Sequence, residues 1–333
     1  MPSKNHKRAL SVALAAILLC GMIAGGFLGL KKIYGLYWQL HDTVNQRADY
    51  TVAYFEELVQ SSYLIERPWA ARIENALQIP YSFDYSWVNS EGVTPLIAHA
   101  LGGINGKVYT NSLEAFEANY ALGHRVFEVD FDLTDDAYYL IASHDQQTWR
   151  ETAGAPQDAP YTRENFLHPD FESGYTLLDY RDIVDLMSEY PDIYNVTDTK
   201  YTDRESVLLQ FSQLVRYALL THPEVLDRVV PQIYHESMLD WVMTVYPFKS
   251  VVFTLYATQW TPDSVYDFCE RSGVRFVTMW SNIPSPELLE SWERLGIITA
   301  AHTINDVDEA IRLLDTGVDM LYTDFLIPSD LSR

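Results

Sequence analysis

The chain has 333 residues, of which 48% are hydrophobic and 14% aromatic, which is enough for a packed core and excludes global disorder. Its formal net charge is −23, with 46 acidic against 23 basic residues. Such an acidic surface repels phosphate backbones, so nucleic acid is a poor candidate partner. A phosphate-bearing substrate would need a local cation in its site, and a bound metal ion is the obvious means.

The first 32 residues predict a membrane anchor. Ala9–Leu30 is an uncharged apolar run, long enough to span a hydrocarbon core about 30 Å thick. A cleaved signal peptide is the alternative, but its apolar core is normally shorter, roughly 7–15 residues. The run here continues to a lysine pair, which favours an uncleaved anchor, and the basic residues before it favour a cytoplasmic N-terminus. We therefore expect a single-pass protein of the cell membrane with its acidic domain outside the cytoplasm.

Residues 33–94 are rich in aromatic side chains and predict a second, smaller segment. Thr51–Gln60 and Pro68–Leu77 have helix-compatible patterns, and Pro68 suits a first helical turn. We expect a short juxtamembrane helical collar packed against the main domain, and we assign it no chemistry. The predicted division is therefore a tail and anchor at 1–32, the collar at 33–94 and the main domain at 95–333.

From Pro95 onward, short apolar runs alternate with amphipathic helical patterns, which indicates βα units and a parallel sheet. Strands are predicted at Pro95–His99, Val126–Asp130, Asp192–Asp198, Val229–Ile233, Ser250–Leu255, Arg275–Met279, Ile297–His302 and Asp319–Thr323. Helices are predicted between them at Ser112–Leu122, Arg204–Leu220, Ser237–Val245, Pro262–Arg271, Pro286–Leu295 and Asp306–Asp315. Glycines follow four of these helices, where a helix end favours a left-handed residue: Gly123, Gly273, Gly296 and Gly317.

Eight strands with interleaved helices predict an α/β fold, a (β/α)8 TIM barrel. A doubly wound open sheet is the alternative, but no glycine-rich phosphate loop follows the first strand to support it. In a TIM barrel, reactive residues gather at the C-terminal ends of the strands. The predicted ends carry His99, Glu128, Asp130, Asp198, Lys200, Gln232, Tyr234, Tyr256, Trp280, His302 and Asp324.

Any one of these residues has an ordinary structural explanation, because a lone aspartate is more often a helix cap and a lone histidine is usually structural. The pattern Glu128-Val129-Asp130 is more informative, since side chains at i and i+2 of a strand face the same way. Adjacent carboxylates repel, and a bound divalent cation or a raised pKa is the usual resolution. With Asp198 on the next strand, the carboxylates predict an oxygen-rich site for Ca2+ or Mg2+.

The stretch Ile97–Asp145 resembles the opening of glycerophosphodiester phosphodiesterases, whose pattern is His-Arg, then Glu-Asn-Thr, then Glu-x-Asp, then His-Asp. This chain has, in the same order, His99-Ala100, Thr110-Asn111-Ser112, Glu128-Val129-Asp130 and His144-Asp145. Further on, three segments are similar to the family's Glu-x-Lys, Trp-Thr-x-Asn and Gly-Val-Asp-x-x-x-Thr-Asp: Asp198-Thr199-Lys200, His302-Thr303-Ile304-Asn305 and Gly317–Asp324. The resemblance covers roughly Pro95–Pro328, which is essentially the whole predicted barrel.

The resemblance implies a role for each matching residue. His99 and His144 match the catalytic acid and base, and Glu128, Asp130 and Asp198 match the ligands of a divalent cation. The remaining matches imply contacts with the substrate, by Asn111, Lys200 and His302. The leading prediction is therefore a metal-dependent phosphoric diester hydrolase that acts outside the membrane on a lipid-derived or polymer-linked glycerophosphate.

Several positions depart from the family pattern, and four of them bear on the site. Ala100 replaces an arginine that grips the phosphate, Thr110 an acidic residue, Asp198 a glutamate and His302 a tryptophan. These changes retain the hydrolytic machinery but predict altered substrate recognition. Two alternatives stay open. One is a catalytically weak or inactive barrel that binds a phosphorylated surface polymer, and the other is phosphoinositide-type cleavage by internal hydroxyl attack.

Overall fold

The computed structural model describes residues 81–136, 138–167 and 174–331. Within this part, eight parallel strands close into a barrel, because β1 pairs with both β2 and β9. The barrel strands are β1 (Leu96–Ala98), β2 (Val126–Leu133), β4 (Tyr194–Thr199), β5 (Val229–Ile233), β6 (Val252–Thr254), β7 (Phe276–Trp280), β8 (Ile298–His302) and β9 (Met320–Thr323). The predicted (β/α)8 barrel is confirmed.

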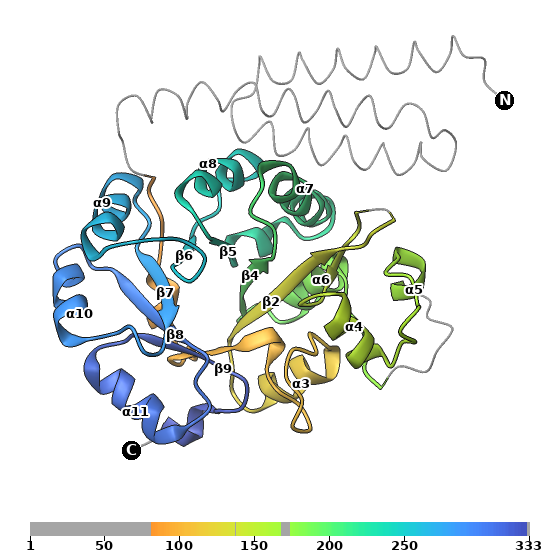
Figure 1. Cartoon of the computed structure of the whole chain (residues 1–333), viewed down its shortest axis with the longest axis horizontal. Helices are drawn as coiled ribbons and strands as arrows, with labels where there is room; N and C mark the ends of the chain where they lie inside the picture. Colours follow the sequence, from red (N-terminus) through yellow and green to blue (C-terminus); the bar gives the residue numbers. More distant parts are fainter. Residues whose placement is uncertain (1–80, 137, 168–173, 332–333) are drawn as a thin grey trace, which may run out of the picture.

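Helices surround the barrel (Figure 1). They are α3 (Leu113–Ala121), α6 (Tyr180–Glu189), α7 (Arg204–Thr221), α8 (Glu236–Val245), α9 (Pro262–Ser272), α10 (Pro286–Glu293) and α11 (Val307–Thr316), with short 3-10 helices η2 (His99–Leu101), η3 (Pro223–Asp227) and η4 (Pro328–Leu331). Side chains that accept a backbone N–H begin several of them, as Ser112 does for α3 and Asp306 for α11. The predicted helix-terminal glycines have positive φ, for example 86° at Gly273 and 107° at Gly317.

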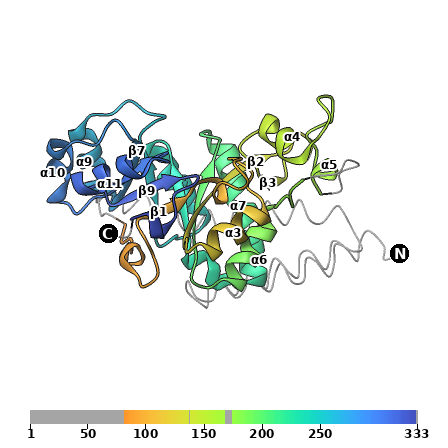
Figure 2. The ribbon, with the colours of Figure 1, turned by 90° about the horizontal axis from the view of Figure 1, so that it is seen from below.

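The connection between β2 and β4 is more elaborate than a simple βα unit. β2 pairs in antiparallel fashion with β3 (Leu140–Ala142), which is followed by α4 (Gln146–Ala153) and α5 (Arg163–Leu167). We call β3, α4 and α5 the β3–α5 insertion. It stands to one side of the ring of helices (Figures 1 and 2) and packs around its own apolar cluster, which includes Trp149 and Phe166. The sequence patterns did not predict these elements, because each is too short to show a clear periodicity.

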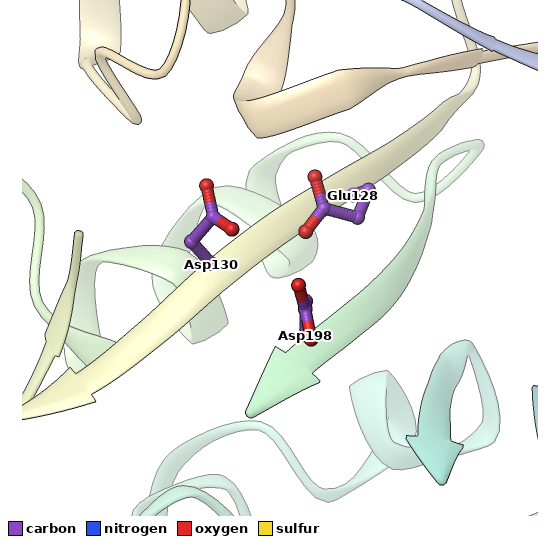
Figure 3. Close-up of side chains that lie close together, drawn as sticks. All are labelled: Glu128, Asp130 and Asp198. Carbon is purple, nitrogen blue, oxygen red and sulfur yellow. The ribbon is translucent and has the colours of Figure 1, made fainter. Parts of the chain in front are cut away.

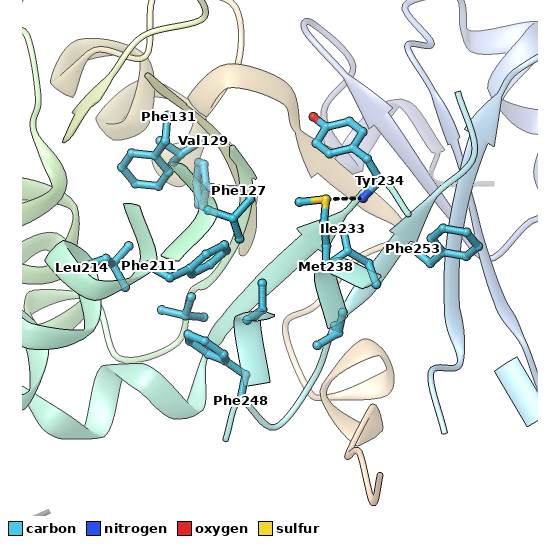
Figure 4. Packing of buried hydrophobic residues seen from close by; sticks show 14 of the residues in the cluster. Phe127, Val129, Phe131, Phe211, Leu214, Ile233, Tyr234, Met238, Phe248 and Phe253 are labelled. Carbon is cyan, nitrogen blue, oxygen red and sulfur yellow. Dashed lines mark hydrogen bonds between the residues drawn. The ribbon is translucent and has the colours of Figure 1, made fainter. Parts of the chain in front are cut away.

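The two faces of β2 explain how the fold positions polar residues. Phe127, Val129 and Phe131 point outward into the apolar layer between strands and helices, where they pack near Phe211 and Leu214 of α7 (Figure 4). The alternate residues of the strand therefore point into the barrel. Burial of the outward face fixes this register, since a slip of one residue would place the phenylalanines inside the barrel and the carboxylates in the apolar layer.

The interior of the barrel is apolar at its N-terminal end. One inward residue from each of the eight barrel strands forms this layer: Ile97, Val126, Val196, Val230, Val252, Phe276, Ala300 and Met320. Trp87, in the 3-10 helix η1 (Ser86–Asn89), packs against this layer at the N-terminal end of the barrel. Its indole N–H donates a hydrogen bond to Ser250 Oγ at 3.0 Å. Because apolar side chains fill the N-terminal end of the barrel, the polar inward residues lie at the C-terminal end of the strands.

Residues 1–80 lie outside the described residues, and with them the predicted anchor and both helix-compatible patterns of the collar. Over the part of the chain that is described, no helix is both long enough and apolar enough to cross a membrane. The described end of the predicted collar, residues 81–94, contains η1. The domain boundaries at residues 32 and 94 stay predictions.

Candidate active site

Three carboxylates from neighbouring strands meet at the C-terminal end of the barrel (Figure 3). Glu128 and Asp130 project from β2 and Asp198 from β4, and Asp130 and Asp198 are register partners across the two strands. One oxygen atom from each lies within 4.8 Å of the others, and all three side chains are buried. The structure therefore brings together the three residues that the sequence suggested as metal ligands.

The chemistry of this cluster fits a divalent cation. Burial, and then the charge of Asp130, raise the pKa of Glu128, and burial also raises the pKa of Asp198. Glu128 Oε1 and Asp198 Oδ1 are buried, and neither has a hydrogen-bond partner among the described residues. Oxygen atoms of carboxylates are the ligands that Ca2+ and Mg2+ prefer. These residues could therefore hold the predicted ion.

Lys200 supplies a positive charge at the same place. Its Nζ lies 2.5 Å from Asp130 Oδ1 and 2.5 Å from Asp198 Oδ2. Burial opposes the charged ammonium, but the carboxylates of Asp130 and Asp198 hold the pKa of Lys200 above its usual range. The lysine is therefore a permanent cation beside the cluster.

Asn111 holds one of the carboxylates in place. Its Nδ2 donates to Asp130 Oδ2 at 2.9 Å, and the backbone N–H of Asp130 donates to Asn111 Oδ1 at 3.1 Å. Asn111 is fully buried and has φ 44°, a left-handed conformation that asparagine adopts more readily than most residues. One hydrogen of its amide nitrogen therefore serves Asp130, and the second has no hydrogen-bond partner among the described residues.

His99 follows β1 and is anchored by Asp324, which directly follows β9. Its Nδ1 lies 2.9 Å from Asp324 Oδ1. A carboxylate can only accept, so Nδ1 carries the hydrogen and Nε2 is left for a substrate. Asp324 is held in turn by Asn305, whose Nδ2 donates to Asp324 Oδ2 at 2.7 Å and whose Oδ1 accepts the Asp324 backbone N–H at 2.8 Å.

The charges around His99 favour its protonated form. Burial opposes the imidazolium, but the hydrogen bond to Asp324 and the charges of Glu128 and Asp130 raise the pKa of His99 to about 9. Sequence reasoning placed Asp324 on the rim but not beside His99. The two residues are 225 positions apart, and only the closure of the barrel brings β1 and β9 together.

His144 lies between β3 and α4, within the β3–α5 insertion. Its Nδ1 is 2.9 Å from Asp145 Oδ2, which again leaves Nε2 for a substrate. The other oxygen of Asp145 accepts the Thr148 backbone N–H at 2.7 Å and so caps α4. The side chain of His144 is 38% exposed, against 12% for that of His99, so His144 has more access to solvent.

Tyr109 links the two histidines, although no sequence pattern singled it out. Its ring makes an edge-to-face contact with each imidazole, at centroid distances of 4.8 Å to His99 and 4.9 Å to His144. The two histidines therefore share one site. The only sequence signal for Tyr109 was its position two residues before Asn111.

His302, at the end of β8, belongs to an aromatic wall built at the C-terminal ends of β6, β7 and β8. Its ring lies 4.5 Å from that of Trp280 and 4.8 Å from that of Tyr256. Burial, together with the nearby cations His99 and Lys200, lowers the pKa of His302 to about 3, so this imidazole is neutral at physiological pH. Trp280 is 48% exposed and presents an apolar surface to solvent.

The fold and the site together define a class of protein. A TIM barrel carries, at its catalytic end, a carboxylate cluster suited to a divalent cation, a lysine and two histidines with carboxylate partners. A cation that can offset phosphate charge and two groups that can exchange protons are the requirements for hydrolysis of a phosphate ester. The class is that of the phosphoric ester hydrolases.

Comparison with known families narrows this class. The model of the glycerophosphoryl diester phosphodiesterase family matches residues 103–327, which begins just after His99 and includes the other predicted site residues. The chain belongs to this family and is a phosphoric diester hydrolase. Among curated proteins, no sequence matches the chain.

Solved structures share the fold at low sequence identity. A phosphodiesterase of Oleispira antarctica, solved with the product sn-glycerol-3-phosphate, has a TM-score of 0.57 and 16% identity, over 70% of this chain and 93% of its own. A glycerophosphoryl diester phosphodiesterase of Parabacteroides distasonis has a TM-score of 0.53 and 17% identity, over 75% and 90%. That of Thermotoga maritima has a TM-score of 0.51 and 15% identity, over 69% and 94%. At these identities the likeness extends to the fold alone.

Proposed function

We propose that the protein is a metal-dependent phosphodiesterase that cleaves a glycerophosphodiester-like substrate, with His99 and His144 as acid and base. One observation carries this proposal. Both imidazoles are bound through Nδ1 to a carboxylate and contact the same ring, that of Tyr109, beside the carboxylate cluster. Two proton-transfer groups thus flank one position, as in-line cleavage of a phosphodiester requires.

The carboxylate cluster and its neighbours would bind the phosphate. Glu128, Asp130 and Asp198 would hold a Ca2+ or Mg2+ ion, which supplies positive charge for the non-bridging oxygens. Lys200 adds a second positive charge that no ordinary pH removes. Asn111 keeps Asp130 in position and has one further amide hydrogen for the substrate.

The surroundings of the two histidines favour His99 as the acid. His99 carries a proton because Asp324 and the carboxylate cluster raise its pKa. A cation bound to the cluster would offset the charge of Glu128 and Asp130, so Asp324 is the partner that would maintain the protonated form. His144 is more exposed and is better placed to receive a proton from an attacking water.

The reaction then balances with these two residues. His144 Nε2 takes a proton from the attacking water as the water oxygen bonds to phosphorus. The bond between phosphorus and the leaving oxygen breaks, and His99 Nε2 gives its proton to the departing alkoxide. The products are a phosphomonoester and an alcohol.

The alcohol part of the substrate would lie against the aromatic wall. His302 and Trp280 form a neutral surface in which the rings are 4.5 Å apart, and Trp280 is half-exposed. A neutral aromatic surface suits the C–H groups of a polyol better than it suits a second phosphate. We therefore assign His302 to substrate binding.

The proposal includes a location. The apolar run Ala9–Leu30 with its basic flanks supports a single-pass membrane anchor, with the barrel outside the cytoplasm and a lipid-derived or envelope-polymer substrate. Protease added to spheroplasts should digest the barrel and leave a short membrane-bound N-terminal fragment. A barrel that stays protected, or a mature protein that begins near Lys31, would contradict this topology.

The function itself is tested by turnover. The full chain in detergent should release a phosphomonoester from glycerophosphodiesters with Ca2+ or Mg2+, and EDTA should abolish the release. A cyclic phosphate as the end product would instead support internal hydroxyl attack. Metal-dependent binding of a phosphorylated polymer without turnover of any diester would support a binding barrel, an alternative that alanine in place of arginine at position 100 favours.

A further inference from the structure

The residue at position 100 cannot bind a phosphate group. Ala100 has a fully buried methyl group and a left-handed backbone, with φ 51° and ψ 43°. Its backbone N–H donates to Glu128 Oε2 at 2.6 Å, so this group serves the carboxylate cluster. The family pattern that this chain resembles has an arginine at this position. Here the position offers neither a side-chain donor nor a free backbone donor.

Most of the other donors near the cluster are already engaged. Lys200 is shared between Asp130 and Asp198. One amide hydrogen of Asn111 serves Asp130. Thr110 is buried, and its hydroxyl lies 3.0 Å from that of Ser112. Beyond the remaining hydrogens of Asn111 and Lys200, a further donor to the phosphate would have to come from elsewhere on the rim.

Tyr109 is the residue placed to supply this contact. Its ring makes edge-to-face contacts with both His99 and His144, so it lies beside both the proposed acid and the proposed base. Its hydroxyl forms no hydrogen bond with the residues that the structure describes. The backbone of Tyr109 is left-handed, with φ 59°, a conformation that is unfavourable for a tyrosine and that concentrates at functional sites.

The electrostatic surroundings of the hydroxyl keep it a donor. Burial raises the pKa of Tyr109, and the charges of Asp324 and Asp130 raise it further. The phenol therefore keeps its proton throughout the pH range in which histidines work as acid and base.

We propose that Tyr109 is a catalytic residue whose hydroxyl donates a hydrogen bond to a non-bridging oxygen of the substrate phosphate, in the role that Ala100 leaves open. Because the acid and the base act on opposite sides of phosphorus, a side chain that contacts both of them lies at the side of the phosphate, where the non-bridging oxygens are. A neutral donor in place of a guanidinium leaves the positive charge at the phosphate to the metal ion, Lys200 and the protonated His99. This inference rests on the proposed function.

The test is a comparison of Tyr109→Phe with the full-length, metal-loaded wild type. The phenylalanine keeps both ring contacts and removes only the hydroxyl, so the melting temperature should not change. We expect kcat/KM for bis(p-nitrophenyl) phosphate to fall by about tenfold or more, since the lost hydrogen bond is to a charged group. The affinity for inorganic phosphate should fall by a similar factor. Tyr138→Phe, a change at an exposed tyrosine, should have no effect on either quantity.

The outcomes separate this inference from the proposed function. If the wild type cleaves diesters and Tyr109→Phe cleaves them equally well, the function stands and the role of Tyr109 is wrong. If the wild type cleaves no diester, the proposed function fails, and phosphate binding by the two proteins still decides the role of Tyr109. Unchanged phosphate affinity in Tyr109→Phe overturns the role in either case. Tyr109→Leu, which also removes the ring contacts, should lose more activity than Tyr109→Phe.

Discussion

His99 is held by the closed barrel, whereas His144 is carried by the β3–α5 insertion outside it. In the barrel, Asp324 and Asn305 fix His99 through contacts between strands far apart in sequence. In the insertion, the partner of His144 is its neighbour Asp145, which also caps α4. The insertion has an apolar cluster of its own around Trp149 and Phe166, while Leu140 and Ala142 of β3 join the main core of the barrel.

This difference suggests a division of labour. The barrel provides buried charges whose positions are fixed by strand register, which suits a metal site that must keep its geometry. The insertion provides an exposed proton acceptor that water can reach. Changes at the buried carboxylates should therefore alter metal binding together with activity, whereas a change at the more exposed His144 should alter activity alone.

The largest effect is expected for His144→Gln. Loss of a general base should lower kcat by roughly 10²–10⁴-fold. The melting temperature should stay within error of the wild type, because the side chain is 38% exposed and belongs to the insertion. Full activity in His144→Gln would show that the insertion contributes no catalytic residue through His144. A large drop in its melting temperature would show that the stabilities of the barrel and the insertion are not independent.

Glu128→Gln should affect activity and metal binding together. Activity should fall by more than about a hundredfold, beyond the effect typical of residues that only support metal ligands. The pKa of Glu128 is raised in the fold, so at neutral pH folding of the metal-free protein must take up a proton at this carboxylate, which lowers its stability. The metal-free variant should therefore melt no lower than metal-free wild type, while losing the stabilisation that added Ca2+ or Mg2+ provides. Calorimetry with and without metal checks both, and undiminished stabilisation by metal would exclude Glu128 as a ligand.

Asp324→Asn should shift the pH profile. An acid must carry its proton, so activity is lost as pH rises through the pKa of His99, which the hydrogen bond to Asp324 raises. Without this negative charge the pKa falls, and the alkaline limb of kcat/KM should move to lower pH by about one unit. Asp319→Asn is the matched control, because Asp319 directly precedes β9 whereas Asp324 directly follows it. This change should leave the alkaline limb in place. If the alkaline limb of kcat/KM does not move in Asp324→Asn, the limb does not reflect the titration of His99.

The smallest effect is expected at the aromatic wall. Trp280→Ala removes the exposed ring beside His302 and should raise KM by about threefold to tenfold with little change in kcat, as for loss of one aromatic contact. Tyr138→Ala, at an exposed tyrosine just before β3, is the control and should leave KM unchanged. Equal KM values for Trp280→Ala and wild type would show that the alcohol part of the substrate does not contact Trp280.

The barrel was predictable from sequence, whereas the connections between distant residues were not. Strand positions such as Val229–Ile233 follow from apolar runs, and the inward direction of Glu128 and Asp130 follows from their spacing. The pairing of His99 with Asp324 depends on barrel closure, and the place of Tyr109 depends on a loop with left-handed residues. Neither leaves a periodic signal. The insertion was missed for the same reason, although His144 within it was found from the family resemblance.

The assignment of His99 as acid and His144 as base is tested most directly by changing the leaving group. An alkoxide needs a proton to depart, whereas p-nitrophenolate departs without one. His99→Gln should therefore lose activity by at least a hundredfold on an alkyl glycerophosphodiester but by only a few-fold on bis(p-nitrophenyl) phosphate. His144→Gln should lose the same large factor on both substrates. If His144→Gln, and not His99→Gln, were rescued by the activated leaving group, the assignment would be contradicted and the two roles would be reversed.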